Sequence, residues 1–274
     1  MTLGGGELSM KQLAYAAVAL LAVVPVAQAQ NRQTDRDAFT WSGRIPDGRW
    51  IRVRNLNGAI LVEPGSGDRV EVTGTKQWRR GDPETVHFEV QKFGPGGESV
   101  VICALWGTRS SCDENSYESH GDKSTRNNDV SVEFRVKVPR GVRVGVYTIN
   151  GGVTVDGATN EVEANTVNGS VEAATTGGPI NATTVNGSVR VRIGRFTGDD
   201  DMSFSTVNGS VTAEFGGDID ADVDLGTVNG RFFTDYPVTV SGRLDPRHLK
   251  ARIGRGGPRI KLSTVNGNVE LRKR

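Results

Sequence analysis

Apolar and polar residues alternate along the C-terminal half of the chain. The apolar positions are mostly small or β-branched and recur at every second residue: Val162 and Ala164; Ile180 and Ala182; Val189, Val191 and Ile193; Val211, Ala213 and Phe215; Val223 and Leu225; Ile260 and Leu262. A period of two indicates β-strands with one buried face, and no stretch in this half shows the helical period of 3.6. The pattern predicts an all-β protein.

The strands are separated by a repeated phrase, Thr-Val-Asn-Gly. It occurs at Thr166–Gly169, Thr184–Gly187, Thr206–Gly209, Thr227–Gly230 and Thr264–Gly267, with a variant at Thr148–Gly151 and a distant copy at Asn55–Gly58. From Asn150 to Asn266, successive Asn residues of the phrase lie 18, 18, 22, 21 and 37 residues apart. A period near twenty indicates that each repeat is one supersecondary unit stacked on its neighbours.

Asn-Gly is a strong signal for a two-residue turn, because both residues tolerate a positive φ. The predicted structural turns are Asn57 and Gly58, Asn150 and Gly151, Asn168 and Gly169, Asn186 and Gly187, Asn208 and Gly209, Asn229 and Gly230, and Asn266 and Gly267. A second turn signal lies roughly opposite in each interval: Asp156-Gly157, Gly177-Gly178-Pro179, Gly198-Asp199 and Gly216-Gly217-Asp218.

Each interval therefore contains a strand, a turn, a second strand and an Asn-Gly turn. Eighteen residues fit one coil of a narrow β-solenoid, in which equivalent turns stack about 4.8 Å apart. The alternative is an antiparallel β-meander of hairpins. The solenoid is favoured, because only a stacked corner explains why all four residues repeat together. The 37-residue interval predicts one distorted or looped-out coil, and Gly267 is expected in the last coil, with a neighbour on one side.

The domain organisation follows from the remaining composition. Residues 1–29 are typical of a signal peptide: Lys11 precedes an apolar run, Leu13–Val26, and Ala27-Gln28-Ala29 is a small-x-small cleavage site. The run is too short for a membrane span. We expect an exported protein, periplasmic, cell-surface or secreted, with no membrane span in the mature chain. It would have a disordered segment 30–38 and one β-solenoid domain, 39–274.

Within this domain the region 39–138 predicts irregular coils, and 139–274 predicts the regular ones. The alternating segments of the first region are Trp50–Arg54, Ala59–Val62, Arg69–Thr73, Thr85–Gln91, Ser99–Leu105 and Val130–Val138. A polar loop, 106–129, holds Cys112, nine residues after Cys103. In an exported protein these two cysteines predict a disulfide at the base of the loop, whereas two cysteines alone lack the partners of a metal site.

These residues resemble a known family. Cys103 and Cys112 ahead of Arg126–Val130, then Val138–Val142, the Thr-Val-Asn-Gly coils and the closing Gly254–Gly267 are similar to the bacterial putative-adhesin domain family. That family consists of exported proteins of unknown function, related in fold to the head GIN auto-transporter adhesin domain. The resemblance covers residues 40–272. It implies a single-stranded right-handed β-helix and carries over no catalytic residue.

The charge is unevenly distributed. Residues 195–235 carry nine acidic and two basic side chains, whereas residues 243–274 carry ten basic and two acidic ones. The basic residues have two interpretations: they prevent pairing at an exposed strand edge, or they bind an anionic envelope glycan or an envelope protein. The candidate basic patch is Arg243, Arg247, Lys250, Arg252, Arg255, Arg259 and Lys261. The total charge of +1 gives no indication of nucleic acid.

We predict no catalytic, cofactor or metal residues. Asp199–Asp201 has the carboxylates that calcium prefers, but a solvated loop explains it as well. The histidines, His87, His120 and His248, are far apart in sequence and lack a recurring partner.

The favoured hypothesis is a non-enzymatic exported protein with an adhesin-like role in envelope interaction. The first alternative is a polysaccharide-active, lyase-like enzyme, which would need clustered acids in a groove. The second is an envelope scaffold or sensing module that binds a partner protein through a broad apolar patch.

The cleavage site gives a first testable prediction. The mature protein is expected to begin at Gln30, because Ala27 and Ala29 occupy the small-residue positions that signal peptidase requires. N-terminal sequencing of the exported protein measures this directly. An exported chain that begins at Met1 or Met10 would contradict it.

Overall fold

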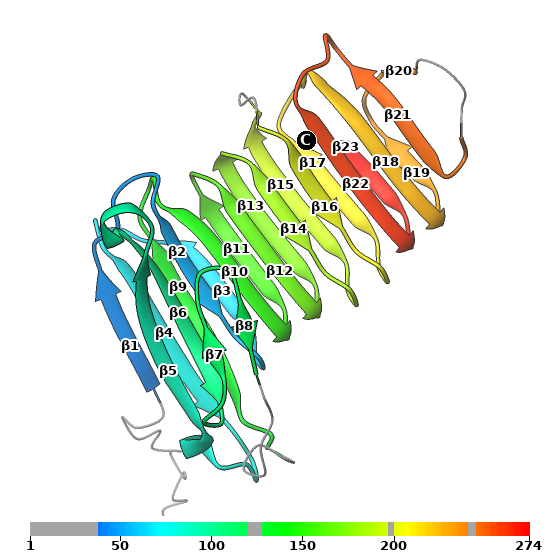
Figure 1. Ribbon diagram of the computed structural model, residues 1–274. Coiled ribbons are helices and arrows are strands. Elements are labelled where there is room, and N and C mark those ends of the chain that lie inside the picture. Colours follow the sequence, from blue (N-terminus) through cyan, green and yellow to red (C-terminus); the bar gives the residue numbers. More distant parts are fainter. Residues whose placement is uncertain (1–37, 120–127, 197–199, 241–244) are drawn as a thin grey trace, which may run out of the picture. The chain divides into compact units, whose positions relative to one another are not determined.

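The computed structural model describes residues 38–119, 128–196, 200–240 and 245–274. All of them belong to the second of the two units into which the chain divides, Met1–Arg32 and Gln33–Arg274. The described ranges contain strands and two short 3₁₀ turns, η2 (Pro83–Thr85) and η3 (Pro95–Gly97), but no α-helix. The all-β prediction is confirmed (Figure 1). The predicted signal peptide and residues 30–37 lie outside the described residues and stay predictions.

The described strands form two large mixed sheets and a two-stranded ribbon. Sheet A has the order β1 (Ala38–Gly43), β4 (Val70–Gln77), β9 (Ser131–Val138), β3 (Ile60–Pro64), β11 (Val153–Ala158), β13 (Val171–Gly177), β15 (Val189–Arg195), β17 (Val211–Phe215), β23 (Val269–Lys273), β19 (Phe232–Thr234). Sheet B has the order β20 (Val238–Val240), β21 (His248–Ile253), β18 (Ala221–Asn229), β22 (Arg259–Asn266), β16 (Met202–Ser205), β14 (Ile180–Thr183), β12 (Val162–Asn168), β10 (Arg143–Asn150), β2 (Trp50–Arg54), β6 (Ser99–Trp106), β5 (Val86–Phe93). The ribbon pairs β7 (Ser111–Cys112) with β8 (Tyr117–Glu118).

The Asn-Gly turns are corners between the two sheets. Each joins a strand of sheet B to the next strand of sheet A, as from β12 to β13. Within each sheet, strands one interval apart pair in parallel, with Val162 opposite Ile180 in sheet B and Val171 opposite Val189 in sheet A. A meander of hairpins would give antiparallel pairs between consecutive strands of one sheet instead.

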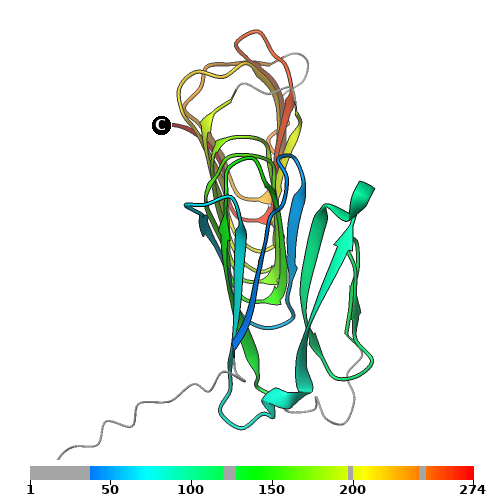
Figure 2. The same ribbon diagram turned by 90° about the vertical axis from the view of Figure 1, so that its left-hand side faces the viewer.

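The two sheets face each other and enclose the core (Figure 2). The alternating residues predicted as apolar point inward, and Val162, Val171, Ile180 and Val211 are fully buried. No helix within the described residues is long and apolar enough to cross a membrane.

The threonine of the repeated phrase is buried on the core side, as its parity predicts. Its hydroxyl donates to the glycine carbonyl of the neighbouring coil: Thr184 Oγ1 lies 2.8 Å from Gly169 O, and Thr206 Oγ1 lies 2.8 Å from Gly187 O. The same bond recurs at Thr148, Thr166, Thr227 and Thr264. A buried hydroxyl is therefore satisfied at every corner without interrupting the core.

The asparagines form a ladder of side-chain amides along the corner. Each Nδ2 donates to the Oδ1 of the next rung, at 2.8–2.9 Å, in the order Asn229, Asn266, Asn208, Asn186, Asn168, Asn150. Asn57 continues the corner by a main-chain bridge to Asn150. The amide side chain thus links neighbouring repeats, a role beyond the turn propensity that predicted it.

The glycine of the phrase is required by a close approach of two backbones. A Cβ on Gly169, Gly187, Gly209 or Gly267 would overlap the carbonyl group of the glycine one rung away. Gly187 also has a φ of +156°, whereas the φ of Gly169 lies outside the range that excludes other residues. The close approach of neighbouring repeats therefore requires glycine at this position independently of the backbone φ.

The expected place of Gly267 is wrong. β22 lies between β16 and β18, so the corner of Gly267 has a rung on each side, Asn208 and Asn229. The outermost corner is that of Asn229 and Gly230. Within the described residues, the interval after Gly230 forms three short strands. β19 pairs with β23 at the end of sheet A, whereas β20 and β21 pair antiparallel beyond β18 before the chain returns to fill the place beside β16.

The second set of turns is partly confirmed. Gly177-Gly178-Pro179 separates β13 from β14, and Gly216-Gly217-Asp218 separates β17 from β18. Asp156-Gly157 instead lies inside β11, where the register shifts and Gly157 has a φ of +61°. The signal marked a β-bulge, which also favours glycine. The turn at Gly198-Asp199 lies outside the described residues.

In the region 39–138 each of the six alternating segments forms a strand, namely β2, β3, β4, β5, β6 and β9. An additional strand, β1, begins at Ala38 and pairs antiparallel with β4. β4 and β5 pair antiparallel with β9 and β6 at this end of the two sheets. Phe39 stacks on Phe88, and Phe88 meets Phe134 edge to face, which closes this end of the core.

The predicted disulfide between Cys103 and Cys112 is confirmed. It fastens the ribbon of β7 and β8 to β6, and the Tyr117 hydroxyl donates to Ala104 O at 2.7 Å. Burial of this ring raises the pKa of Tyr117, so its hydroxyl stays protonated as a donor. Residues 120–127 of the loop lie outside the described residues.

Four Gly→Ala variants test the close approach at the corner. Gly169 has only the steric conflict, Gly217 has only a positive φ (+88°), Gly187 has both, and Gly177 has neither. We expect a loss of about 1–3 kcal/mol in Gly169→Ala from overpacking, about 1 kcal/mol or more in Gly217→Ala from backbone strain, and the largest loss in Gly187→Ala. Denaturant unfolding measures each free energy.

Gly177→Ala is the control, expected within about 0.5 kcal/mol of the parent. If Gly169→Ala matches this control, the glycines are needed for turn conformation alone, and close packing at the corner has no energetic weight.

Candidate functional site

The acidic and basic segments lie side by side in sheet B. β18, from the acidic segment, pairs antiparallel with β21 and parallel with β22, which both come from the basic segment. The outward side chains of β18 are thus flanked by basic residues on two sides. The sequence shows the alternation of Asp220, Asp222 and Asp224, but it does not show that the acidic strand lies between two basic ones.

The resulting surface is ordered in two main rows by the strand register. One row runs from Thr239 through Arg252 and Asp222 to Arg259. The next runs from Lys250 through Asp224 to Lys261. We call this surface the charged ladder and define it as Thr239, His248, Lys250, Arg252, Asp222, Asp224, Arg259 and Lys261.

Some of its charges are paired within the ladder. His248 Nε2 lies 2.5 Å from Asp224 Oδ1, and Arg252 Nε lies 3.4 Å from Asp222 Oδ1. Within the described part of the chain, the side chains of Lys250, Lys261 and Arg259 form no ion pair. The main-chain N–H of Arg259 donates to Asp201 Oδ1 at 2.7 Å, so that carboxylate positions the start of β22.

The predicted basic patch gathers in part. Lys250, Arg252, Arg259 and Lys261 share the outer face of the ladder. Arg247 lies in the turn before β21, where its N–H donates to Asp245 Oδ1 at 2.8 Å.

Of the other two patch residues, Arg255 is the one that lies among the described residues. Arg255 lies in the turn after β21 and pairs with Asp220 at 2.8 Å. The main-chain N–H of Arg255, followed by its guanidinium, lowers the pKa of Asp220. Arg243 lies outside the described residues.

An open cavity of about 370 Å³ lies on the ladder. It is lined by Asp222, Val223, Asp224, Thr239, Lys250, Ala251, Arg252 and Arg259. Its volume falls within the range of about 300–1,000 Å³ that is usual for small-molecule sites. The cavity therefore combines space for a ligand with charged groups of both signs.

The histidines do not assemble into a site. His87 lies on β5 and His248 on β21, near opposite ends of sheet B, and His120 lies outside the described residues. The described residues contain no group of three or more His, Cys, Asp or Glu side chains placed to hold a metal ion. Of Asp199–Asp201, the first lies outside the described residues and Asp201 bonds to β22.

A second cluster on sheet B was not predicted. The Arg52 guanidinium lies 4.5 Å above the Trp50 ring and 2.9 Å from Glu163. Arg54 donates to Glu114 O at 2.6 Å, and burial, followed by repulsion from Arg52, lowers its pKa. Since Glu114 lies in the turn between β7 and β8, these arginines hold the disulfide-linked ribbon against the sheet. No local sequence signal joins residues so far apart.

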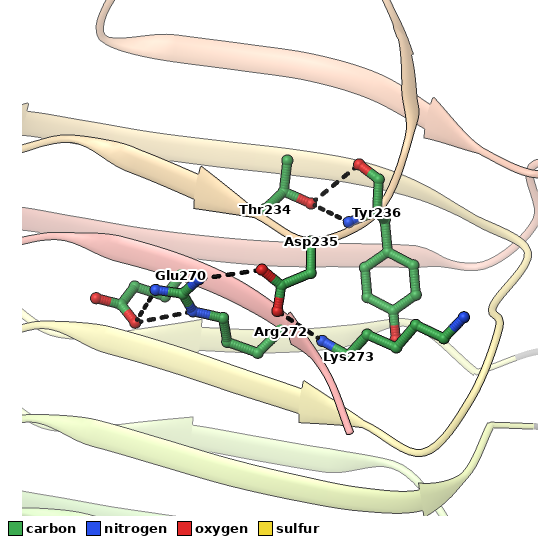
Figure 3. Close-up of polar contacts among 6 residues, drawn as sticks. All are labelled: Thr234, Asp235, Tyr236, Glu270, Arg272 and Lys273. Carbon is green, nitrogen blue, oxygen red and sulfur yellow. Dashed lines mark hydrogen bonds and ion pairs between the residues drawn. The ribbon is translucent and has the colours of Figure 1, made fainter.

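A third cluster fastens the end of sheet A (Figure 3). Arg272 of β23 lies 3.1 Å from Asp235, and the N–H of Lys273 donates to the same carboxylate at 3.2 Å. These two contacts, with the main-chain bond first, lower the pKa of Asp235. Nearby, the buried Tyr236 donates to Gly217 O at 2.9 Å, and burial raises its pKa to about 12. The cluster ties β19 to β23 and has a structural role.

Comparisons with known proteins identify the fold. No family model and no curated protein matches the sequence. A putative cell adhesion protein from Clostridium sporogenes is similar in structure, with a TM-score of 0.53 and 8% identity over 86% of this chain and 100% of the other. A putative adhesin from Bacteroides fragilis has a TM-score of 0.33 and 10% identity over 86% and 97%. At such identity the likeness to the first is one of fold.

Replacement of Asp235 by Asn tests the cluster at the end of sheet A. A depressed pKa means that the ionised carboxylate stabilises the fold above the unfolded pKa of about 3.9, and that this contribution is lost as the pH falls through the folded value. We therefore expect Asp235→Asn to lower the free energy of unfolding at pH 7, with a difference from the parent that shrinks below about pH 4.

Denaturant unfolding at several pH values measures this difference. Glu172→Gln is the matched control, because the Glu172 side chain makes no hydrogen bond or ion pair in the part of the chain that the structure describes. A loss for Asp235→Asn that stays constant with pH would show that the carboxylate charge is not what fastens β23.

Proposed function

We propose that this protein is a non-enzymatic, exported β-solenoid of the putative-adhesin family, with an adhesin-like role in envelope interaction. Its coils would form a single-stranded right-handed β-helix. Support for the coil comes from the parallel pairs one interval apart and from the corners that stack rung on rung. Support for export comes from the cleavage signal and from the disulfide, which persists in oxidising compartments.

The observation that carries the role is a contrast between the two outer faces. On sheet A, several arginines pair with glutamates of neighbouring strands, as Arg135 with Glu63 at 3.3 Å and Arg192 with Glu214 at 3.7 Å, although Arg190 forms no ion pair among the described residues. On the charged ladder, Lys250, Arg259 and Lys261 have no such partner among the described residues. Cations without partners beside a cavity favour an anionic ligand, and we propose an envelope glycan.

The scaffold alternative needs a broad exposed apolar surface. The exposed valines of the repeated phrase, Val185, Val207, Val265 and Val228, are 36–51% exposed and follow one another along the corner. They form a row one residue wide, which suits a solvated corner better than a protein interface.

The lyase-like alternative has one observation in its favour. A cavity of about 270 Å³ on sheet A is lined by Glu63, Asp156 and Glu172 together with Arg190 and Arg192. Glu63 is already paired with Arg135. Release of unsaturated products from polygalacturonate, lost in Glu172→Gln, would replace the binding role by an enzymatic one.

A pull-down from isolated envelope material tests the proposed role. The double variant Lys250→Glu, Lys261→Glu is expected to retain about tenfold less glycan than the parent, because it reverses the charge of the ladder. Retention by the parent should fall as salt rises from about 0.05 to 0.5 M.

Arg190→Glu with Arg192→Glu is the matched control, since it makes the same change of charge on sheet A. Equal retention by the two double variants would mean that binding follows net charge and does not involve the ladder.

A further inference from the structure

The cavity on the charged ladder has two kinds of charged group within one small space. Lys250, Arg252 and Arg259 supply the positive charges, whereas Asp222 and Asp224 lie between the two basic strands. A site for a bare phosphate or sulfate has no use for carboxylates, because like charges repel a bound anion. The presence of Asp222 and Asp224 therefore disfavours a bare anion as the ligand.

Each of these acids has an oxygen to spare. Arg252 and His248 occupy Oδ1 of Asp222 and of Asp224, respectively, and in the described part of the chain Oδ2 of each accepts no hydrogen bond. An ionised carboxylate only accepts, so its free oxygens suit donors that carry no negative charge. Hydroxyl groups of a ligand meet that requirement.

Thr239 adds a third kind of group at the rim. Its side chain is exposed on β20, directly opposite Arg252 in the register, and its hydroxyl both donates and accepts. Unpaired cations, free carboxylate oxygens and a hydroxyl thus face one cavity of about 370 Å³.

The geometry points to an acidic sugar, a ring with a carboxylate and neighbouring hydroxyls, as the ligand of the charged ladder. Lys250 and Arg259 bind its carboxylate, Asp222 and Asp224 accept from its hydroxyls, and Thr239 completes the rim. The inference rests on the proposed function, since it specifies the glycan at the same surface. It also excludes polymers that offer charge without hydroxyls.

Isothermal titration of the mature protein with three probes tests this. The probes are tetragalacturonate, with charge and hydroxyls; maltotetraose, with hydroxyls alone; and linear tetraphosphate, with charge and no sugar ring. Tetragalacturonate is expected to bind at least about tenfold more tightly than either other probe, because loss of hydrogen bonds to charged groups is worth about that factor.

Two variants separate the contributions of the ladder. Lys250→Gln should weaken tetragalacturonate about tenfold by removing a charge-assisted contact. Asp224→Asn should weaken the binding of tetragalacturonate and strengthen the binding of tetraphosphate. It removes both a carboxylate that accepts from hydroxyls and a negative charge that repels phosphate. This change of opposite sign is the signature of the inference.

A further variant avoids the ion pairs. Thr239→Val keeps the shape of the side chain and changes neither Asp222 nor Asp224. It should weaken the binding of tetragalacturonate about threefold, the contribution of one hydrogen bond, and leave the binding of tetraphosphate unchanged. Thermal unfolding of each variant confirms that the fold is retained, and Arg190→Gln on sheet A serves as the control that should leave all three probes unaffected.

The outcomes distinguish the inference from the proposed function. Tetraphosphate that binds as tightly as tetragalacturonate, with both strengthened in Asp224→Asn, overturns the acidic sugar and keeps an anion-binding ladder. Absence of binding by all three probes, with envelope glycan still retained in the pull-down, also overturns the inference alone. Absence of retention in the pull-down removes the proposed function itself.

Discussion

The structure depends on how closely successive repeats approach at the Thr-Val-Asn-Gly corner. The glycine carbonyl of one repeat accepts a hydrogen bond from the threonine hydroxyl of the next, and the same glycine leaves no room for a Cβ on its neighbour. The asparagine amides then connect the rungs outside the main chain. Threonine, asparagine and glycine are each required by a contact with the adjacent repeat that depends on the side chain or on its absence, which is why they recur together. Valine takes part through its main-chain carbonyl, as Val167 O accepts from Asn186 N–H at 2.8 Å, and its side chain contributes no such contact.

Opposite charges stabilise the order of the strands β21, β18 and β22 in sheet B. β18 has aspartates at two alternate positions, Asp222 and Asp224, and both strands beside it have lysine or arginine at the positions in register. Opposite charges across strands contribute about 0.2–1 kcal/mol each, whereas like charges destabilise. A shift of β22 by one residue would bring its apolar residues outward and lose these contacts. The acidic and basic segments thus help to fix which strands become neighbours, and the side chains of Lys250, Arg259 and Lys261 form no ion pair among the described residues.

Local patterns predicted the local structure. The alternation predicted strands such as β2, β12 and β22, the Asn-Gly pairs predicted the corners, and the two cysteines predicted the disulfide, because each depends on residues close in sequence or on a single pair. The position of Gly267 and the contact of Arg54 with Glu114 were not predictable in this way. Both depend on which distant strands pack together. The cavity on the ladder was likewise not predictable from local sequence, because residues of β18, β20, β21 and β22 line it together.

The placement of β22 between β16 and β18 has a consequence for the order in which the protein folds. The repeats from Asn150 to Asn208 can each be added to the one before it, with intervals of 18 or 22 residues to close. Asn266 instead meets Asn208 across 58 residues, and Asn229 reaches the stack only through Asn266. Longer closures cost more entropy and slow folding. A nascent chain that has emerged as far as residue 258 would hold β18 without its partner β22, so the charged ladder is complete only after β22 has been synthesised.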